Sequence, residues 1–437
     1  MRRSSLRNPS RLISALALAA LAASSQATAP AKTWCADRCD QIVIDWNLQT
    51  HQVIEAADGY RDPMAASRIL AMVHLAMHDA VNAAQPRYRA YAYQPDVGPS
   101  HAGADAPVAA AVAAHDVLAT LYPAQQSLLR ATLDATLLDA GVGPAVEQGR
   151  QLGAAAAAAM LARRADDGSR AEESYQPGSR PGDYRFVPGF DFVAAPHWRA
   201  VTPFTMRAPD QFRVAPPPTL TSTRYAVDFD EVKATGSKAV DAQRSTEQTQ
   251  YAAYWYEFSD IGWNRIARSV ARSKPQDLWE RARSFALLNA VMADAYIAGW
   301  DSKMHYDLWR PVTAIREAAH DGNPATVPDL AWTPLLTTPP VQDHPSTHSA
   351  LGAAAAVVLA HVFGSDEVPF TMASTSALPQ APARSFASFS AAARENADSR
   401  VRAGLHFRFA TSAGLQLGAQ IGRQAAASLL GPVTQAH

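Results

Sequence analysis

Residues 62–85 read DPMAASRILAMVHLAMHDAVNAAQ, and this stretch indicates which kind of fold the chain adopts. Its apolar residues recur at the three- and four-residue steps of one helix face, as at Ile69, Val73, Ala76 and Ala80. Asp62 can cap such a helix, and Pro63 suits its first position. Ala-rich segments of similar character follow at 105–120, 123–140 and 144–164. We therefore expect an N-terminal helical layer.

The second half of the chain has the same helical period. Helical patterns resume near 241–258, 276–300, 303–319, 346–363, 383–397 and 404–430. No alternating strand pattern, tandem repeat or heptad run is present in the sequence. Residues 166–240 differ, because they are rich in Pro, Gly and aromatic residues and cannot hold long helices.

These patterns predict an all-α fold of two packed helical bundles joined by a long ordered loop. We divide the chain into a leader at 1–27, the N-terminal layer at 28–165, the Pro/Gly/aromatic loop at 166–240 and a C-terminal bundle at 241–437. The C-terminal bundle contains the candidate catalytic and anion-binding residues. The loop is too aromatic to be a floppy linker, and long loops in compact proteins often have a function.

Composition narrows the class of function. The 437 residues are 48% hydrophobic and 18% charged, with a net charge of −1, so we expect a sizeable core and no nucleic-acid partner. The sequence has no phosphate-loop, dinucleotide-binding, HExxH or Gly-x-Ser-x-Gly motif. These absences disfavour the usual nucleotidases, nicotinamide enzymes, zinc proteases and α/β-hydrolases.

The N-terminus has the layout of a secretory signal peptide. A basic stretch precedes the apolar run LISALALAALAA at 12–23, which is followed by small residues. No other stretch is long and apolar enough for a transmembrane segment. We therefore expect an exported protein, periplasmic or extracellular. Cys35 and Cys39, the two cysteines, could form one local disulfide in that compartment.

Three short segments of the last third carry chemistry: Lys303-x6-Arg310-Pro311, Asp343-His344-Pro345-Ser346-Thr347-His348, and Ser399-Arg400-x5-His406. Seven residues make two helical turns, so we expect Lys303 and Arg310 on the same helix face. An apolar helical run follows His348, which places Ser346 and Thr347 at a helix N-terminus, where free amides attract anions. Three cations, a hydroxyl and two histidines together suit a phosphate-like oxyanion.

The ordered triplet resembles the signature of the vanadium-dependent haloperoxidase and type 2 phosphatidic acid phosphatase superfamily. The motifs span 303–406. Two further stretches of sequence, HLAMHDAVNAA and HYDLWRPVTAIREA, are similar to those of secreted bacterial haloperoxidase-like members. The resemblance implies a vanadate cofactor, with hydrogen peroxide, a halide and a small organic acceptor as reactants.

The resemblance also implies roles for individual residues. Vanadate oxygens would be held by Lys303, Arg310, Ser346, Thr347 and Arg400. His406 would bind vanadium axially, His348 would handle protons, and the Lys303 charge would assist halide oxidation. Trp300, His305 and His344 are candidates for the halide side or for contacts behind the ligands. Haloperoxidase chemistry is the leading interpretation.

Two alternatives remain open. A secreted acid phosphatase would need no cofactor, would hold a phosphomonoester in the same pocket and would form a phosphohistidine at His406. A catalytically silent oxyanion-binding homologue is the other. Thr347 stands where the family motif has Gly, and Ala410 stands where many members have an Asp that orients the histidine. Val341 replaces an aromatic residue of chloroperoxidases, so we expect bromide to be used more readily than chloride.

Two further features have ordinary explanations. His74 and His78 have the i, i+4 spacing of metal ligands but sit beside an apolar stripe, so we favour a structural role. The Ala-rich helical surface is compatible with a homodimer.

Overall fold

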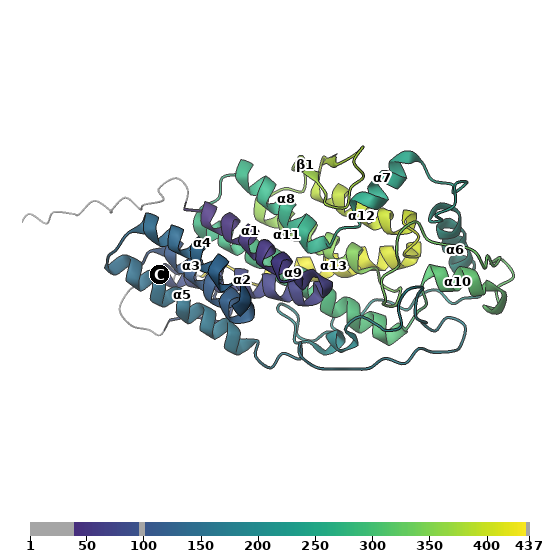
Figure 1. Cartoon of the computed structure of the whole chain (residues 1–437), viewed down its shortest axis with the longest axis horizontal. Coiled ribbons are helices and arrows are strands. Elements are labelled where there is room, and N and C mark those ends of the chain that lie inside the picture. The colour runs from purple at the N-terminus through teal and green to yellow at the C-terminus, as the bar shows by residue number, and fades with distance from the viewer. Residues whose placement is uncertain (1–38, 96–100, 434–437) are drawn as a thin grey trace, which may run out of the picture.

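The structure, a computed structural model, describes residues 39–95 and 101–433. In these ranges helices are the dominant regular structure, which confirms the all-α prediction (Figure 1). The N-terminal helices are α1 (Gln41–Ala56), α2 (Pro63–Ala84), α3 (Ala106–Leu121), α4 (Gln126–Ala140) and α5 (Pro144–Arg163). The later helices are α6 (Thr223–Thr235), α7 (Thr246–Tyr254), α8 (Ser259–Ser273), α9 (Leu278–Tyr306), α10 (Pro311–Glu317), α11 (Thr347–Phe363), α12 (Phe389–Arg402) and α13 (Arg408–Ser428).

The helix α2 begins as its sequence predicts. The Asp62 side chain accepts a hydrogen bond of 3.0 Å from the Ala65 amide, and Pro63 occupies the first position of the helix. Almost every residue of α2 is buried, because α3, α5 and α9 pack around it. This confirms the predicted helical layer near the N-terminus.

The 29-residue helix α9 joins the two ends of the molecule. It packs against α2 on the N-terminal side and against α11 and α13 on the C-terminal side. One hydrophobic core cluster runs through all of these helices. Figure 1 shows α2 to α5 gathered at one end of the elongated molecule and α6, α7 and α10 at the other.

The segment 166–240 contains a helix that the sequence analysis missed. Most of it has no regular structure, apart from a 3-10 turn at Pro196–Ala200, but α6 spans Thr223–Thr235. Ser222 caps α6, and Tyr225, Phe229 and Val232 form its buried face. The preceding Pro-rich stretch obscured this short amphipathic pattern, so the prediction of a loop throughout 166–240 is wrong.

Two further differences concern short elements. Helix α8 was not expected, and a two-stranded antiparallel hairpin, β1 (Phe370–Ala373) with β2 (Ala383–Phe386), lies where no strand was expected. Strands of four residues are too short to show a clear alternation. The leader at 1–27 and Cys35 lie outside the described residues, so the leader and the disulfide stay predictions.

Helices α11 and α13 make the closest helix contact of the C-terminal part through glycines spaced four residues apart. A Cβ on Gly414 would overlap the Ser346 carbonyl oxygen, and one on Gly418 would overlap that of Ala350. A Cβ on Gly422 would lie 3.0 Å from the Ala354 carbonyl oxygen. The glycines thus let the α13 backbone approach the start of α11, where the second motif lies.

We predict that Gly418→Ala destabilises the protein by about 1–3 kcal/mol, because the added methyl group forces α13 away from α11. Chemical denaturation followed by circular dichroism measures this change. Gly103→Ala is the matched control, since a Cβ there meets nothing within 4 Å. Equal stability of Gly418→Ala and the parent protein would contradict the close contact.

Candidate oxyanion site

The three motifs meet at the ends of four helices. Lys303 lies in the last turn of α9, and Arg310 is the residue before α10. Ser346 caps the N-terminus of α11, and Arg400 lies in the last turn of α12. His406 sits in the short connection between α12 and α13. Three segments that are separate in the sequence thus contribute five residues to one site.

Lys303 and Arg310 do not share a helix face, contrary to our expectation. Helix α9 ends at Tyr306, and Asp307 adopts a left-handed conformation with φ of 50°. Arg310 is extended, with Pro311 starting the next helix. A residue before proline disfavours helical geometry, so the chain turns before Arg310. The two cations approach the site from two directions.

All three cations are buried, and carbonyl oxygens hold them in place. Lys303 Nζ donates to the Gln342 oxygen at 2.5 Å and to the Asp343 oxygen at 3.2 Å. Arg310 donates to the carbonyls of Val341 and Leu405 at 2.6 and 2.8 Å. Arg400 Nη1 donates to the Trp255 carbonyl at 3.2 Å, while its Nε is buried without a partner.

The site has an excess of positive charge. Among the described residues, Asp343 is the only carboxylate within 4 Å of these cations, at 3.9 Å from Arg310 Nη1. Burial, and then the neighbouring Arg310, holds the pKa of Lys303 well below its usual value. Burial also lowers the pKa of Arg400 to about 10. A bound anion with two negative charges would neutralise this excess and restore the favourable charged states.

The N-terminus of α11 adds hydrogen-bond donors, as predicted. The Ser346 amide donates to the Ala410 carbonyl at 2.9 Å, and its hydroxyl accepts from Ser349 Oγ at 2.9 Å. Thr347 occupies the first helical position, with its hydroxyl buried and unpartnered. A Cβ on Gly299 would lie 3.6 Å from the Thr347 side chain, so that side chain lies against α9. Gly299 therefore provides room for the threonine that replaces glycine in the motif.

His348 lies on the wall of a cavity. Its Nε2 is 3.3 Å from the Glu257 carbonyl, and Asn396 donates to the His348 carbonyl at 3.1 Å. Because a carbonyl can only accept, Nε2 carries the proton, and Nδ1 keeps its lone pair. Burial, and then the Arg400 charge, lowers the pKa of His348 well below its usual value. The imidazole is therefore neutral at pH 7 without a bound anion.

His406 lies between a cation and a carboxylate. Its Nε2 is 2.9 Å from Arg310 Nη1, and its Nδ1 is 2.9 Å from Asp343 Oδ1. Burial, and then Arg310 and Lys303, lowers the pKa of His406 well below its usual value. A neutral imidazole leaves one ring nitrogen free to act as a ligand or nucleophile.

A cavity of about 440 Å³ leads to this site. His348 and Arg400 belong to its lining. The other lining residues are Glu55, Asp58, Tyr60, Tyr256, Glu257, Phe258, Ile261, Pro339 and Thr375. The Tyr60 and Phe258 rings stack with centroids 5.8 Å apart. This entrance combines three aromatic rings with three carboxylates and can admit a small organic molecule, and its lining includes no residue of 166–240.

The three candidates for the halide side have different environments. Trp300 is buried and donates to the Ala194 carbonyl at 3.0 Å. His344 is also buried, and its Nε2 lies 2.9 Å from the Ala215 carbonyl. Burial lowers the pKa of His344 to about 4. His305 is exposed and contacts the Tyr306 ring, so the structure does not bring it into the site.

His74 and His78 are buried in α2. His74 Nε2 lies 2.8 Å from the Asn47 side-chain amide, and His78 Nε2 lies 3.4 Å from the Arg89 carbonyl. No group of three possible metal ligands occurs within residues 39–95 and 101–433. These contacts agree with a structural role.

Sequence analysis assigned no role to four residues around the site: Asp343, Tyr256, Glu257 and Asn396. Asp343 contacts His406, and the Tyr256 ring centroid is 5.7 Å from Arg400 Cζ. Glu257 and Asn396 position His348 through the contacts given above. Of these four residues only Asp343 lies inside a motif, so the sequence could have indicated a place near the site for Asp343 alone.

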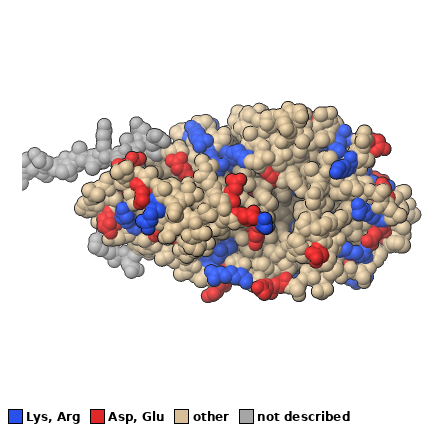
Figure 2. Space-filling view, viewed as in Figure 1, with Lys and Arg blue, Asp and Glu red and all other residues tan. Residues whose placement is uncertain are grey.

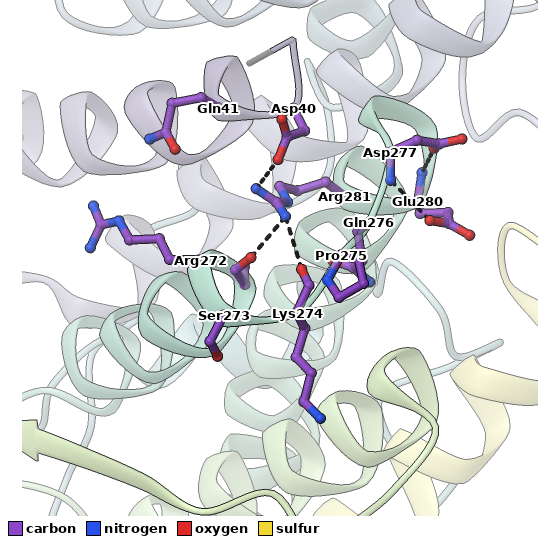
Figure 3. Close-up of a pocket in the computed structure, with 11 residues that line it drawn as sticks. Asp40, Gln41, Arg272, Ser273, Lys274, Pro275, Gln276, Asp277, Glu280 and Arg281 are labelled. Carbon is purple, nitrogen blue, oxygen red and sulfur yellow. Dashed lines mark hydrogen bonds and ion pairs between the residues drawn. The ribbon is translucent and has the colours of Figure 1, made fainter. Parts of the chain in front are cut away.

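A larger cavity of about 590 Å³ lies elsewhere, where α8 ends and α9 begins (Figure 3). There Arg281 pairs with Asp40 and donates to the Ala271 carbonyl at 2.8 Å. Asp277 and Glu280 are engaged in capping α9. The cavity contains no motif residue, so we do not assign the oxyanion to it.

Figure 2 shows acidic and basic side chains scattered over the visible face of the protein without a large patch of one sign. In the described part of the chain, no helix combines the length and apolar character needed to cross a membrane.

The buried cations make a candidate oxyanion site in a helical-bundle protein, and comparisons with known proteins show what this chain resembles. Residues 283–434 match the family model for the second helical-bundle domain of vanadium chloroperoxidase. The vanadium chloroperoxidase of Curvularia inaequalis is 27% identical over 71% of this chain, and the match spans 64% of the fungal protein.

Solved structures show the same fold. A bacterial vanadium-dependent iodoperoxidase superposes with a TM-score of 0.73 and 26% identity, covering 92% of this chain and 96% of that one. A bacterial vanadium-dependent chloroperoxidase, in its holo form, has a TM-score of 0.69 and 20% identity, covering 84% and 91%. In sequence and in fold this chain is therefore similar to the vanadium haloperoxidases.

We predict that Arg400→Met lowers the affinity for oxyanions without lowering the stability of the anion-free protein. The variant removes a buried cation that has no carboxylate partner, and such a charge is costly to bury. Orthovanadate at about 100 times its Kd should stabilise the parent protein by about 2.7 kcal/mol. Thermal unfolding with and without the anion measures both effects. Arg130→Met, at an exposed position of α4, is the control, and an undiminished rise in Tm for Arg400→Met would contradict the assignment.

Proposed function

We propose that this protein is a vanadate-dependent haloperoxidase that uses hydrogen peroxide to oxidise a halide and thereby halogenates a small organic acceptor. The observation that carries the proposal is the group of three buried cations around His406 with a single carboxylate nearby. The relatives named as vanadium chloroperoxidase and iodoperoxidase support it.

The residues at the site fit vanadate. Arg400 Nε and the Thr347 hydroxyl are buried polar atoms without partners, as expected where an oxygen-rich ligand binds. The positive excess matches an anion with two charges. His406 Nε2 faces this charge, at 2.9 Å from Arg310. A histidine nitrogen is a suitable ligand for the central atom, and guanidinium groups suit its oxygens.

We assign the oxygens of vanadate to Lys303, Arg310 and Arg400, with the Ser346 hydroxyl and the Thr347 amide completing the set. When bound, vanadate supplies Lewis acidity that activates hydrogen peroxide toward a halide. The cations and helix-end amides are fixed before reaction, so they stabilise developing negative charge without reorganising. Lys303, held by two carbonyls, keeps its ammonium group directed into this pocket.

His348 acts as the acid–base group in this proposal. Its Nδ1 keeps a lone pair, because Nε2 faces the Glu257 carbonyl. A neutral imidazole on the cavity wall can take a proton from incoming hydrogen peroxide and return one to the product. Burial, and then the Arg400 charge, lowers the pKa of His348 and so favours return of that proton.

We propose bromide as a better substrate than chloride. Val341 is buried next to the site and is smaller and less polarisable than an aromatic residue. Trp300 remains available as a halide-side residue, but its indole N–H is occupied by the Ala194 carbonyl. The organic acceptor would enter through the cavity that His348 lines.

An acid phosphatase is the second candidate. The Asp343 contact favours it, because a carboxylate beside His406 can orient a nucleophilic histidine even though residue 410 is alanine. In that reaction His406 would form a phosphohistidine, and His348 would protonate the leaving alcohol. We also propose that the mature protein is exported, as the leader pattern indicates.

We predict that the purified protein brominates phenol red only when orthovanadate, hydrogen peroxide and bromide are all present. His406→Ala should abolish bromination, and His348→Ala should lower its rate by about 10²–10⁴-fold, the usual contribution of acid–base catalysis. His320→Ala, an exposed histidine, is the matched control and should keep the full rate. The absorbance change of the dye gives the rates.

A parallel assay with p-nitrophenyl phosphate, without vanadate, tests the phosphatase. Phosphate release that needs His406 and is inhibited by vanadate, with no bromination, would replace the haloperoxidase proposal. Folded protein that is inactive in both assays would favour the silent homologue.

A further inference from the structure

Asp343 is a fully buried carboxylate to which the haloperoxidase proposal gives no task. It lies three residues before Ser346, in the segment that supplies carbonyl oxygens to Lys303. Its Oδ1 is 2.9 Å from His406 Nδ1 and 3.9 Å from Arg310 Nη1. Arg310 Nη1 lies near both ring nitrogens, 2.9 Å from Nε2 and 3.4 Å from Nδ1, so the carboxylate contacts Nδ1 while the guanidinium is closer to Nε2.

Neither oxygen of this carboxylate has a well-aligned side-chain donor among the described residues, although the Phe407 backbone N–H lies close enough to lower its pKa. A buried carboxylate without a donor is costly, so a suitable donor is expected close by. The His406 Nδ1 is at hydrogen-bonding distance from Oδ1, so its N–H is the side-chain donor available to this carboxylate. Arg310 Nη1 is closer to Nε2 than to Nδ1, and an oxyanion bound at Nε2 would replace that contact.

The contact between Asp343 and His406 Nδ1 affects which nitrogen of the imidazole carries the proton. A neutral imidazole carries one proton, and either nitrogen can hold it. An acceptor at Nδ1 keeps the proton on Nδ1 and therefore leaves the Nε2 lone pair available for a central atom. The same contact fixes the plane of the ring. No carboxylate is available from α13 at the position four residues after His406, because that residue is Ala410.

We propose that Asp343 is a positioning residue, which fixes His406 in the Nδ1–H form and directs Nε2 at the bound oxyanion. This inference rests on the proposed function only in taking His406 as the residue that bonds to that anion. Asp343, from the segment before α11, thus provides His406 with the carboxylate partner that α13 lacks at Ala410. Partners of this kind typically change metal affinity by about 10–100-fold when removed.

A second role is possible for a carboxylate near three cations, and it predicts the opposite result. If Asp343 served only as a counter-charge, its removal would make the pocket more positive and tighten oxyanion binding. If it positions His406, its removal weakens the binding of vanadate, which bonds to the histidine. The binding of phosphate, which the cations alone can hold, should weaken less or become tighter.

Isothermal titration of the anion-free protein with orthovanadate and with inorganic phosphate separates these roles. We expect Asp343→Ala to weaken vanadate binding by about 10–100-fold. Asp343→Asn, which keeps an acceptor oxygen but removes the charge, should weaken it less. Tighter binding of vanadate by both variants would overturn the proposal.

The tautomer of His406 gives a readout that needs neither vanadate nor activity. Nitrogen-15 NMR of the histidine-labelled, anion-free protein should show His406 with its proton on Nδ1, and this signature should change in Asp343→Ala. A proton on Nε2 in the parent protein would overturn the proposal even if Asp343→Ala fails to fold. If the parent protein binds no vanadate but shows the Nδ1–H form, the proposed function fails and the positioning contact stands.

Discussion

Three buried cations arranged around one imidazole are the constraint on which the rest of the site depends. Burying an unpaired cation costs several kcal/mol, and the protein offsets this cost with carbonyl oxygens and one carboxylate, Asp343. Carbonyl dipoles reduce the cost without cancelling the charge. Burial, and to a smaller extent the Arg310 charge, lowers the pKa values of Lys303 and Arg400. The excess of buried positive charge is therefore unfavourable without a ligand, and a doubly charged oxyanion would neutralise it. The cavity lined by His348 and Arg400 lies beside these cations.

The helices hold this unfavourable group together because their ends are fixed by packing. Glycines at 414, 418 and 422 bring the α13 backbone against α11, so the connection that carries His406 lies beside the helix that starts at Ser346. Helix α9 passes through both halves of the core and ends with Lys303 in its last turn. The left-handed Asp307 then redirects the chain, so that Arg310 approaches from a second side. Rigid elements thus fix the cations before any ligand arrives.

Sequence patterns predicted the helical fold and the start of α11, because caps, prolines and apolar periods act locally. They did not predict how Lys303 and Arg310 converge, because a two-turn spacing carries no information about the left-handed residue between them. They missed α6, a short helix next to a Pro-rich stretch. The partner of His406 was sought four residues downstream, at Ala410, whereas the structure places Asp343 there from a distant segment. Contacts between segments depend on packing, which a single sequence does not display.

The central claim is that Lys303, Arg310 and Arg400 bind a vanadate ion whose central atom bonds to His406. A crystal structure of the protein soaked with orthovanadate tests this claim directly. The account predicts an anion in contact with all three cations and the Ser346 hydroxyl, with His406 Nε2 as the protein atom nearest vanadium. Vanadate bound elsewhere, or bound among the cations with His406 still paired to Arg310 through Nε2, would contradict the account.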